Sequence, residues 1–150
     1  MNNKKTSKKN VEIYTDGSCD PNPGPGGWAA LIIRNGREKM ISGSETHSTN
    51  NRMELTAAIK ALKEIAPDYT VQLHTDSQYL KKGVTEWMAN WKARNWKRKG
   101  GKLANVDLWK KLSKEIEDRQ IEWKWVKAHA GNRLNTKVDM EARAIARGRK

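Results

Sequence analysis

The sequence predicts an α/β fold, in which a five-stranded mixed sheet is flanked by helices. Alternating runs typical of strands occur near the start, the middle and the end of the chain, at Val11–Asp16, Thr70–Asp76 and Ile121–Lys127. The dipeptide Asn35-Gly36 is a strong signal for a two-residue hairpin. A helical pattern also lies between two of the strands, and a strand–helix–strand crossover places helices on the faces of a sheet.

The first three strands are expected to pair as an antiparallel meander. Val11–Asp16 alternates from residue to residue and stops at a carboxylate. Pro21–Gly27 is too rich in proline and glycine for a helix, and we expect an irregular loop whose backbone can approach a ligand closely. Trp28–Arg34 and Arg37–Glu45 are predicted as the second and third strands, joined by the Asn35-Gly36 turn.

Thr49–Ala66 is predicted to be a helix that ends before Pro67. Its apolar residues recur at spacings of three and four, at Leu55, Ala58, Leu62 and Ile65. A further helix is expected from Ser77 to about Trp87, after the fourth strand. The remaining elements are a helix, the fifth strand, a loop and a last helix, at Val106–Asp118, Ile121–Lys127, Lys127–Asn135 and Thr136–Arg149.

The chain is expected to form one domain over residues 11–150, preceded by a disordered basic arm over residues 1–10. The arm has no apolar segment behind it and does not resemble a secretory signal. The longest apolar run, Trp28–Ile33, is too short to span a bilayer. The single cysteine, Cys19, cannot form an internal disulfide, which fits a reducing cytoplasm.

The net charge indicates a polyanionic partner. The chain carries 30 Lys and Arg residues against 17 Asp and Glu residues, a formal charge of +13. Nucleic acid is the first interpretation of this excess and an anionic membrane surface the second. The segment Trp87–Val106 has three tryptophans and six basic residues but no acid. It is either a groove for a phosphate backbone, which we favour, or an amphipathic helix whose tryptophans pack on the core.

Four carboxylates occupy positions where chemistry is expected. They end two strands or lie near the start of two helices, at Asp16, Glu54, Asp76 and Asp139. Each has an ordinary structural alternative. Asp16 fits a turn residue, Glu54 a capping-box partner of Asn51, Asp76 a helix N-cap, and Asp139 a favourable acid in a first helical turn.

Taken together, the four acids favour a metal site. Strand ends and helix starts in an open α/β sheet share one rim, where ligands bind. Carboxylates gathered on one rim repel one another unless a cation lies between them, and Mg²⁺ or Mn²⁺ prefers such oxygen ligands. In so basic a chain, a phosphodiester is the natural substrate.

Four segments resemble motifs of the bacterial type 1 ribonuclease H family, in family order and at family spacing. They read TDGSCDPNPGPGG, NNRMEL, TDSQY and WVKAHAG. The likeness extends from about Val11 to Ala146. It implies the ribonuclease H-like fold, and an endonuclease that hydrolyses the RNA strand of an RNA–DNA hybrid to leave 3′-hydroxyl and 5′-phosphate ends.

The resemblance also implies roles for individual residues. Asp16, Glu54, Asp76 and Asp139 match the family's metal-binding catalytic carboxylates, and His129 matches a mobile histidine that helps move a proton or release product. Two Mg²⁺ ions, about 4 Å apart, would hold the scissile phosphate, with Asp16 as the bridging ligand and Mn²⁺ as the alternative ion.

Further positions resemble the family's substrate contacts. The polar contacts in the minor groove match Asn22, Asn50, Asn51 and Gln78. A pocket for a DNA-strand phosphate matches Thr49 and Asn135. The basic protrusion that grips the DNA strand matches Trp87, Trp91, Lys92, Lys97, Arg98 and Lys99. The expected partner is an RNA–DNA hybrid, and the expected state is a monomer without a membrane partner.

Three positions depart from the family pattern. Ala128 replaces a glycine before the histidine, and His47 replaces a basic side chain near the phosphate pocket. Met140-Glu141 follows Asp139 where a leucine is usual at the second position, so an acid is expected to face the core unless the helix is rotated or Glu141 finds a partner.

Two other functions share most of these features. One is a binding module for hybrids or duplexes without catalysis, and the presence of all four acids argues against it. The other is a metal-dependent DNA nuclease on the same fold. Polar residues suited to a 2′-hydroxyl and the lack of an extra domain argue against that function.

Overall fold

A computed structural model of the chain describes residues 9–97, 103–127 and 132–148. Within these ranges the strands form one five-stranded sheet in the order β3-β2-β1-β4-β5. The strands are β1 (Lys9–Cys19), β2 (Gly24–Arg34), β3 (Arg37–Ser48), β4 (Tyr69–Thr75) and β5 (Gln120–Trp125). β1, β2 and β3 pair antiparallel, whereas β4 pairs parallel to both β1 and β5. The predicted mixed sheet with its antiparallel meander is confirmed.

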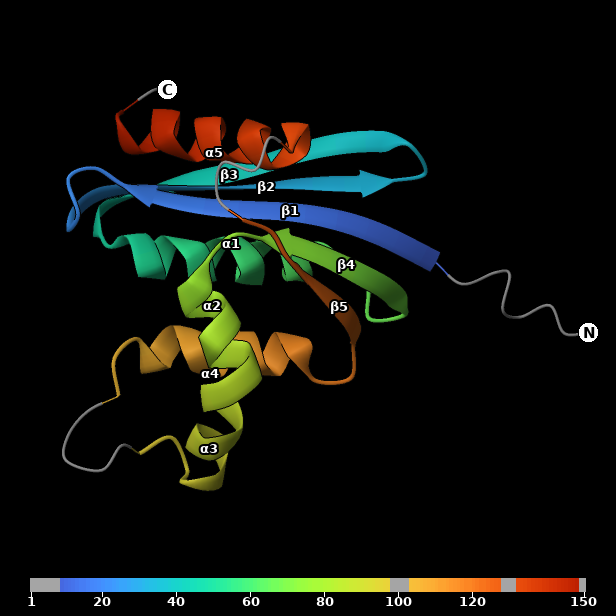
Figure 1. The fold of residues 1–150 in the computed structure, drawn as a ribbon, viewed down its shortest axis with the longest axis vertical. Coiled ribbons are helices and arrows are strands. Elements are labelled where there is room, and N and C mark those ends of the chain that lie inside the picture. The colour runs from blue at the N-terminus through green and yellow to red at the C-terminus, as the bar shows by residue number, and fades with distance from the viewer. Residues whose placement is uncertain (1–8, 98–102, 128–131, 149–150) are drawn as a thin grey trace, which may run out of the picture.

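Helices cover both faces of the sheet. They are α1 (Asn50–Lys63), α2 (Gln78–Lys82), the π-helical turn η2 (Gly83–Trp87), α3 (Met88–Ala93), α4 (Val106–Ile116) and α5 (Arg133–Ala146). Figure 1 shows α5 on one side of the sheet and α1 on the other, with α4 beyond α1 and α2 and α3 projecting away from the strands.

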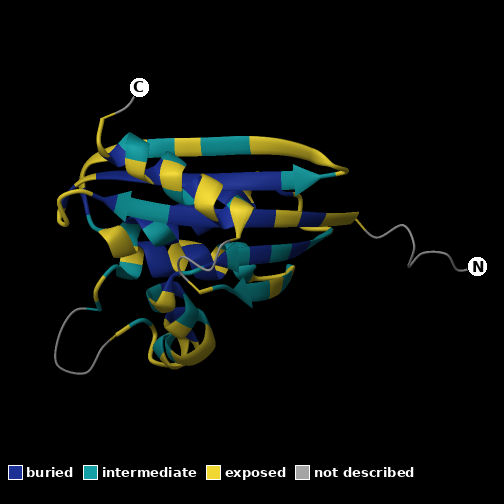
Figure 2. Cartoon of the chain, turned by 45° about the horizontal axis from the view of Figure 1, so that its top comes forward, coloured by how far each residue is buried: buried dark blue, intermediate teal, exposed yellow. Residues whose placement is uncertain are grey.

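Buried apolar side chains lie on both faces of the central strands, which Figure 2 shows as largely buried. The largest cluster joins α1 and α4 to the sheet and includes the fully buried Leu62, Leu73 and Trp109. A smaller cluster joins α5 to β1 and β2, where Val138 and Ala142 pack with Leu31. The sheet is therefore held from both sides where β1 lies.

β2 begins earlier than the sequence pattern indicated, because four glycine- and proline-rich residues belong to the strand. Gly24–Gly27 was expected to lie in an irregular loop, but it pairs with β1 and β3. A Cβ at Gly26 would lie 2.8 Å from Sδ of Met53 in α1, and one at Gly27 would lie 2.5 Å from the carbonyl oxygen of Ala142 in α5. Helices press on both faces of the strand here, and only glycine leaves room for them.

The predicted helix from Ser77 to Trp87 continues to Ala93 through a change of helical type. The π-helical turn η2 separates α2 from α3 and begins at Gly83. A Cβ on Gly83 would fall among the ring carbons of Trp109. Such turns insert one extra residue into a helix, and here the turn lies where α4 presses its largest side chain on the helix.

The last helix begins at Arg133, three residues before the predicted start, because Asn132 caps it. The Asn132 Oδ1 accepts hydrogen bonds from the backbone N–H of Leu134 at 3.0 Å and of Asn135 at 2.9 Å. The apolar stripe of Val138, Ala142 and Ala146 faces the sheet.

The departure at Met140-Glu141 does not place an acid in the core. Met140 is 65% exposed, and Glu141 is half-buried beside the apolar stripe rather than on it. The helix thus keeps its packing on the sheet.

None of the helices in the described ranges combines the length and the hydropathy needed to cross a membrane.

Candidate active site

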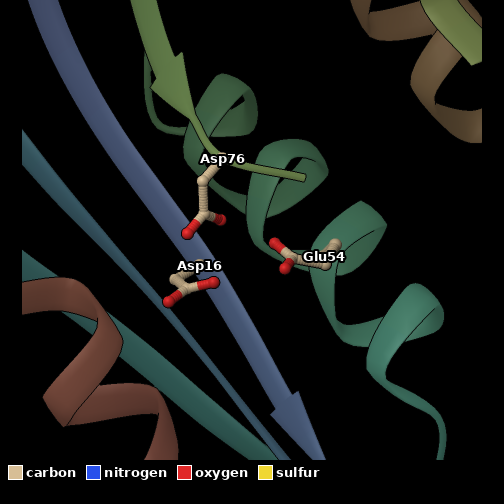
Figure 3. A group of neighbouring side chains, drawn as sticks. All are labelled: Asp16, Glu54 and Asp76. Carbon is tan, nitrogen blue, oxygen red and sulfur yellow. The ribbon is translucent and has the colours of Figure 1, made fainter. Parts of the chain in front are cut away.

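Three of the predicted carboxylates converge at one edge of the sheet. Oxygen atoms of Asp16, Glu54 and Asp76 all lie within 4.8 Å of one another. Figure 3 shows the three side chains pointing toward a common point, Asp16 from β1, Glu54 from α1 and Asp76 from the segment after β4. The parallel pairing of β1 with β4 ends at Tyr14 and His74, so the two aspartates lie two residues beyond the last pair. β1 and β4 are therefore no longer paired where the acids meet.

The structure excludes the ordinary structural role of each acid. Asp16 lies inside β1 opposite Ala29 and is not a turn residue, so the strand does not stop there as predicted. The cap of α1 is Thr49, whose hydroxyl accepts from the Arg52 N–H at 3.1 Å, and Glu54 therefore belongs to no capping box.

The same holds for the other two acids. The cap of the helix after β4 is Ser77, whose hydroxyl accepts from the Leu80 N–H at 3.1 Å, so Asp76 is not an N-cap. Because α5 begins at Arg133, Asp139 falls in its second turn and not its first. Thus neither a turn, a helix cap nor a first helical turn explains why an acid occupies any of these four positions.

Gly17 permits the close approach of α1 to β1 that brings Glu54 to Asp16. A Cβ at Gly17 would lie 2.5 Å from the backbone nitrogen of Glu54 and 2.7 Å from Cβ of Met53. The Gly17 N–H also donates a hydrogen bond of 2.9 Å to Oδ1 of Asp16. No local sequence pattern indicates this role of Gly17, and only the packing shows that it sets the distance between two acids.

The acids strongly perturb one another. Asp16 is only 4% exposed, and burial, the charge of Asp76 and a hydrogen bond with Asp139 raise its pKa to about 8, against a small lowering by the Gly17 N–H. Burial is also the main cause that raises the pKa of Glu54 well above its usual range, followed by the charges of Asp16 and Asp76. The ionised cluster therefore needs a positive charge.

The fourth acid, Asp139, lines the same cavity but is held by a cation. The cavity measures about 240 Å³ and is lined by Asp16, Gly17, Glu54, Asp76, Asn135, Thr136, Asp139 and Arg143. Arg143, one helical turn after Asp139, bonds both of its oxygens, Nη2 to Oδ2 at 2.9 Å and Nε to Oδ1 at 3.3 Å. Sequence reasoning missed Arg143, although its spacing of four residues from Asp139 was a signal that could have found it.

The residues of the cavity fit divalent metal ions. The ligands that they offer are carboxylate oxygens, the donor type that Mg²⁺ and Mn²⁺ prefer. Oε1 of Glu54 is buried without a hydrogen-bond partner, as is Oδ1 of Asn135. Buried polar atoms without partners are rare, and a cation between the acids would satisfy the glutamate oxygen.

The predicted minor-groove residues lie beside α1 and at the start of α2. Asn22 and Asn50 are joined, since the Asn50 N–H donates to Oδ1 of Asn22 at 3.2 Å. Asn51 and Gln78 are exposed, each in the first turn of its helix. Of the predicted phosphate pocket, Thr49 caps α1, and Asn135 lies in the acid cavity. The departure His47 is an exposed residue of β3.

The tryptophans of the basic segment pack on the core, as one of its two alternatives predicted, while its role as a groove for a phosphate backbone stays a prediction. Trp87 and Trp91 are partly buried against the main core, and with Tyr79, Leu103 and Ala104 they also line an open pocket of about 480 Å³. Lys92 and Lys97 are exposed beside them. The predicted site residues Arg98, Lys99 and His129, and the departure Ala128, lie outside the described residues.

The chain matches the family model described as RNase H over residues 8–147. It is 54% identical to a protein named Ribonuclease H of Hahella chejuensis over 132 residues, 87% of this chain and 89% of the relative. It is 53% identical to another of that name from Xanthomonas campestris pv. campestris over 136 residues, 90% of this chain and 91% of the relative.

Two solved structures share the fold. LC9-RNase H1, described as a type 1 RNase H with the type 2 active-site motif, superposes with a TM-score of 0.84 at 32% identity, covering 95% of this chain and 74% of its own. LC11-RNase H1, solved in complex with an RNA/DNA hybrid, superposes with a TM-score of 0.67 at 20% identity, covering 89% of this chain and 94% of its own.

Proposed function

The chain belongs to the ribonuclease H family, and from that premise we propose that it is a metal-dependent endonuclease that hydrolyses the RNA strand of RNA–DNA hybrids. The observation that carries this proposal is the meeting of Asp16, Glu54 and Asp76 within 4.8 Å, with one glutamate oxygen buried and unpartnered. These side chains come from β1, α1 and the segment after β4, and neither capping nor turn formation accounts for them.

Asp16, Glu54, Asp76 and Asp139 are the residues that would hold the ions. When bound, a pair of Mg²⁺ ions would supply an activated water and stabilise the leaving 3′-oxygen. Asp16 occupies the central position, because the charges of both Asp76 and Asp139 act on its carboxyl group. A cation held there would lower the pKa of Asp16 and of Glu54, both of which burial raises.

Selection of the RNA strand requires contacts with the 2′-hydroxyl, the group that DNA lacks. The joined pair Asn22 and Asn50, with the exposed amides of Asn51 and Gln78, offers the donors and acceptors for it. The exposed lysines beside Trp87 and Trp91 supply charge for the DNA strand. His129 is proposed to move a proton or assist product release.

The proposal is tested with three labelled duplexes of one sequence: an RNA–DNA hybrid, duplex DNA and duplex RNA. We expect cleavage of the hybrid alone, only in its RNA strand, with Mg²⁺ and not with EDTA. The products should carry 5′-phosphate and 3′-hydroxyl ends, which is checked by ligation. Cleavage in EDTA would exclude the metal mechanism. Tight binding without cleavage would identify a binding module, and cleavage of duplex DNA a DNA nuclease.

We further propose that the protein works in the cytoplasm as a monomer that uses Mg²⁺. Cys19 is the only cysteine in the sequence, and its thiol is buried, where it donates to the carbonyl oxygen of Gly24 at 3.1 Å. Sedimentation at catalytic and tenfold higher concentrations should give a single species near the chain mass of 17.1 kDa. A dimer at catalytic concentration would contradict the monomer.

A further inference from the structure

Asp139 lies beside the other three acids and is bound by the guanidinium group of Arg143. It lines the cavity, but only Asp16, Glu54 and Asp76 have oxygens that all lie within 4.8 Å of one another. Arg143 holds Asp139 through two contacts, at 2.9 and 3.3 Å. Both oxygens of the fourth ligand are therefore occupied by a guanidinium group.

Arg143 is also the only basic residue among those described around the cavity. It therefore offsets part of the negative charge that the four acids bring to the cavity. The pair is not needed to close the core, because the Arg143 and Asp139 side chains are 45% and 29% exposed. Surface pairs at this spacing contribute little to stability. Arg143 therefore matters more for its position beside the acids of the cavity than for its contribution to folding.

We propose that Arg143 is a positioning residue that competes with divalent metal ions for Asp139, and so sets the affinity of the site for them. This inference rests on the metal site of the proposed function. In the metal-free protein the guanidinium holds Asp139. A cation that uses Asp139 must displace the guanidinium or accept it as a close positive neighbour, and either outcome weakens binding.

The test is calorimetric titration of the protein with Mn²⁺ at 0.15 M salt, without nucleic acid. Arg143→Gln should tighten Mn²⁺ binding by roughly three- to tenfold, the size expected when one unit charge is removed near a dication at a partly exposed site. Arg143→Lys, which keeps the charge but loses the two-pronged contact, should fall between Gln and wild type.

Arg147→Gln is the matched control. Arg147 is one turn further along α5, is exposed, and pairs with Asp20 at 3.3 Å away from the cavity. This variant loses the same charge but should leave the Mn²⁺ affinity within about twofold, because its charge is screened by salt.

A double-mutant cycle shows whether the effect acts through Asp139. In the Asp139→Asn background, Arg143→Gln should change the affinity by less than about twofold. Three results would overturn the inference. Arg143→Gln could tighten Mn²⁺ binding just as much in the Asp139→Asn background, it could leave binding unchanged or weaker on its own, or Arg147→Gln could tighten binding equally. Weaker binding would instead make Arg143 an aid to metal binding.

Failure of this inference is separable from failure of the proposed function. If wild type binds Mn²⁺ and Asp16→Asn does not, the metal site stands whatever Arg143 does. If neither binds Mn²⁺, the metal site itself is wrong, and the competition proposed for Arg143 falls with it.

Discussion

At the scale of single residues, the buried carboxyl of Asp16 makes the stability of the fold depend on pH. Its pKa is raised to about 8 in the metal-free fold, whereas an unfolded aspartate has its usual pKa of 3.8. The folded state therefore binds more protons than the unfolded state between these values, and the free energy of unfolding falls as the pH rises through this range. Burial of Asp16 therefore costs the metal-free protein stability at neutral pH, where the folded state must hold this carboxyl largely protonated.

Asp16→Asn should remove that cost. We expect the variant to be more stable than wild type in EDTA at pH 8 by up to ~5 kcal/mol, at ~1.4 kcal/mol per pKa unit, and nearly equal to it at pH 4. Urea unfolding at both pH values measures this. Asp20→Asn, which neutralises an exposed acid, is the control. A stability gain that is equal at both pH values would contradict the assignment to Asp16 ionisation.

Glu54→Gln tests the second buried acid through activity. The amide keeps the size of the side chain but cannot carry the charge that a metal ion requires. Cleavage of the hybrid should fall by at least about a hundredfold in kcat, a loss typical of removing one electrostatic group from an active site. Hybrid affinity, measured in EDTA by fluorescence anisotropy, should remain. Equal loss of binding and cleavage would point to a substrate contact instead.

At the scale of elements, the contact between β1 and α1 fixes the distance between two acids of the cluster, Asp16 and Glu54. Gly17→Ala places a methyl group 2.5 Å from the Glu54 nitrogen, and α1 must move away. We expect a loss of ~1–3 kcal/mol in stability, as for other overpacked sites, together with a fall in kcat.

A glycine elsewhere supplies the control for that variant. Gly36→Asn replaces a glycine with a φ of +76° and open space around it, where asparagine is tolerated, and should leave activity unchanged. Urea unfolding and initial rates on the hybrid measure both variants. A Gly17→Ala protein as active and stable as wild type would show that this contact does not position Glu54.

The sequence predicted the strands and helices well where side chains alternate or recur, and less well where packing decides. Period-two and period-3.6 patterns located the strands and the longer helices. Gly24–Gly27 was misinterpreted as a loop, because glycine is a turn signal locally but serves close helix contacts here. The continuation of α2 into α3 through Gly83 depends on Trp109, which is distant in the sequence, so no local pattern could show it.

At the scale of the whole molecule, the excess of positive charge should control hybrid affinity. A protein with a net charge of +13 binds a polyanion more weakly as salt increases, because bound counterions are released at each phosphate contact. Replacing the exposed Lys92 and Lys97 by glutamine should reduce the slope of log affinity against log salt by up to about 2. The rate of cleavage at saturating hybrid should change little.

Lys39 and Lys63 provide the matched double variant. Each is already paired with a carboxylate, Lys39 with Glu64 at 3.1 Å and Lys63 with Glu115 at 3.3 Å, so their replacement by glutamine should leave the slope unchanged. Anisotropy titrations in EDTA between 0.05 and 0.3 M salt, a span of about one decade, compare the two pairs. Equal slopes for both double variants would exclude a specific role of the segment after Trp91.

The sequence named four acids as candidates, because motif context and element ends point to them, and all four line one cavity. The distances between them could not be predicted, since they depend on how α1 and α5 pack on β1. Arg143 was missed because an acid and a base four residues apart on a helix commonly form only a surface pair. Its contact with the site appears only when the turn that carries it is placed over the other three acids.

The most direct test of the central claim is a crystal structure of the protein soaked in Mn²⁺, with anomalous diffraction used to locate the ions. The account predicts an anomalous peak between Asp16, Glu54 and Asp76, and its loss in crystals of Asp16→Asn. Peaks only at other places, or a peak unchanged in Asp16→Asn, would contradict the claim that these carboxylates form the metal centre of the enzyme.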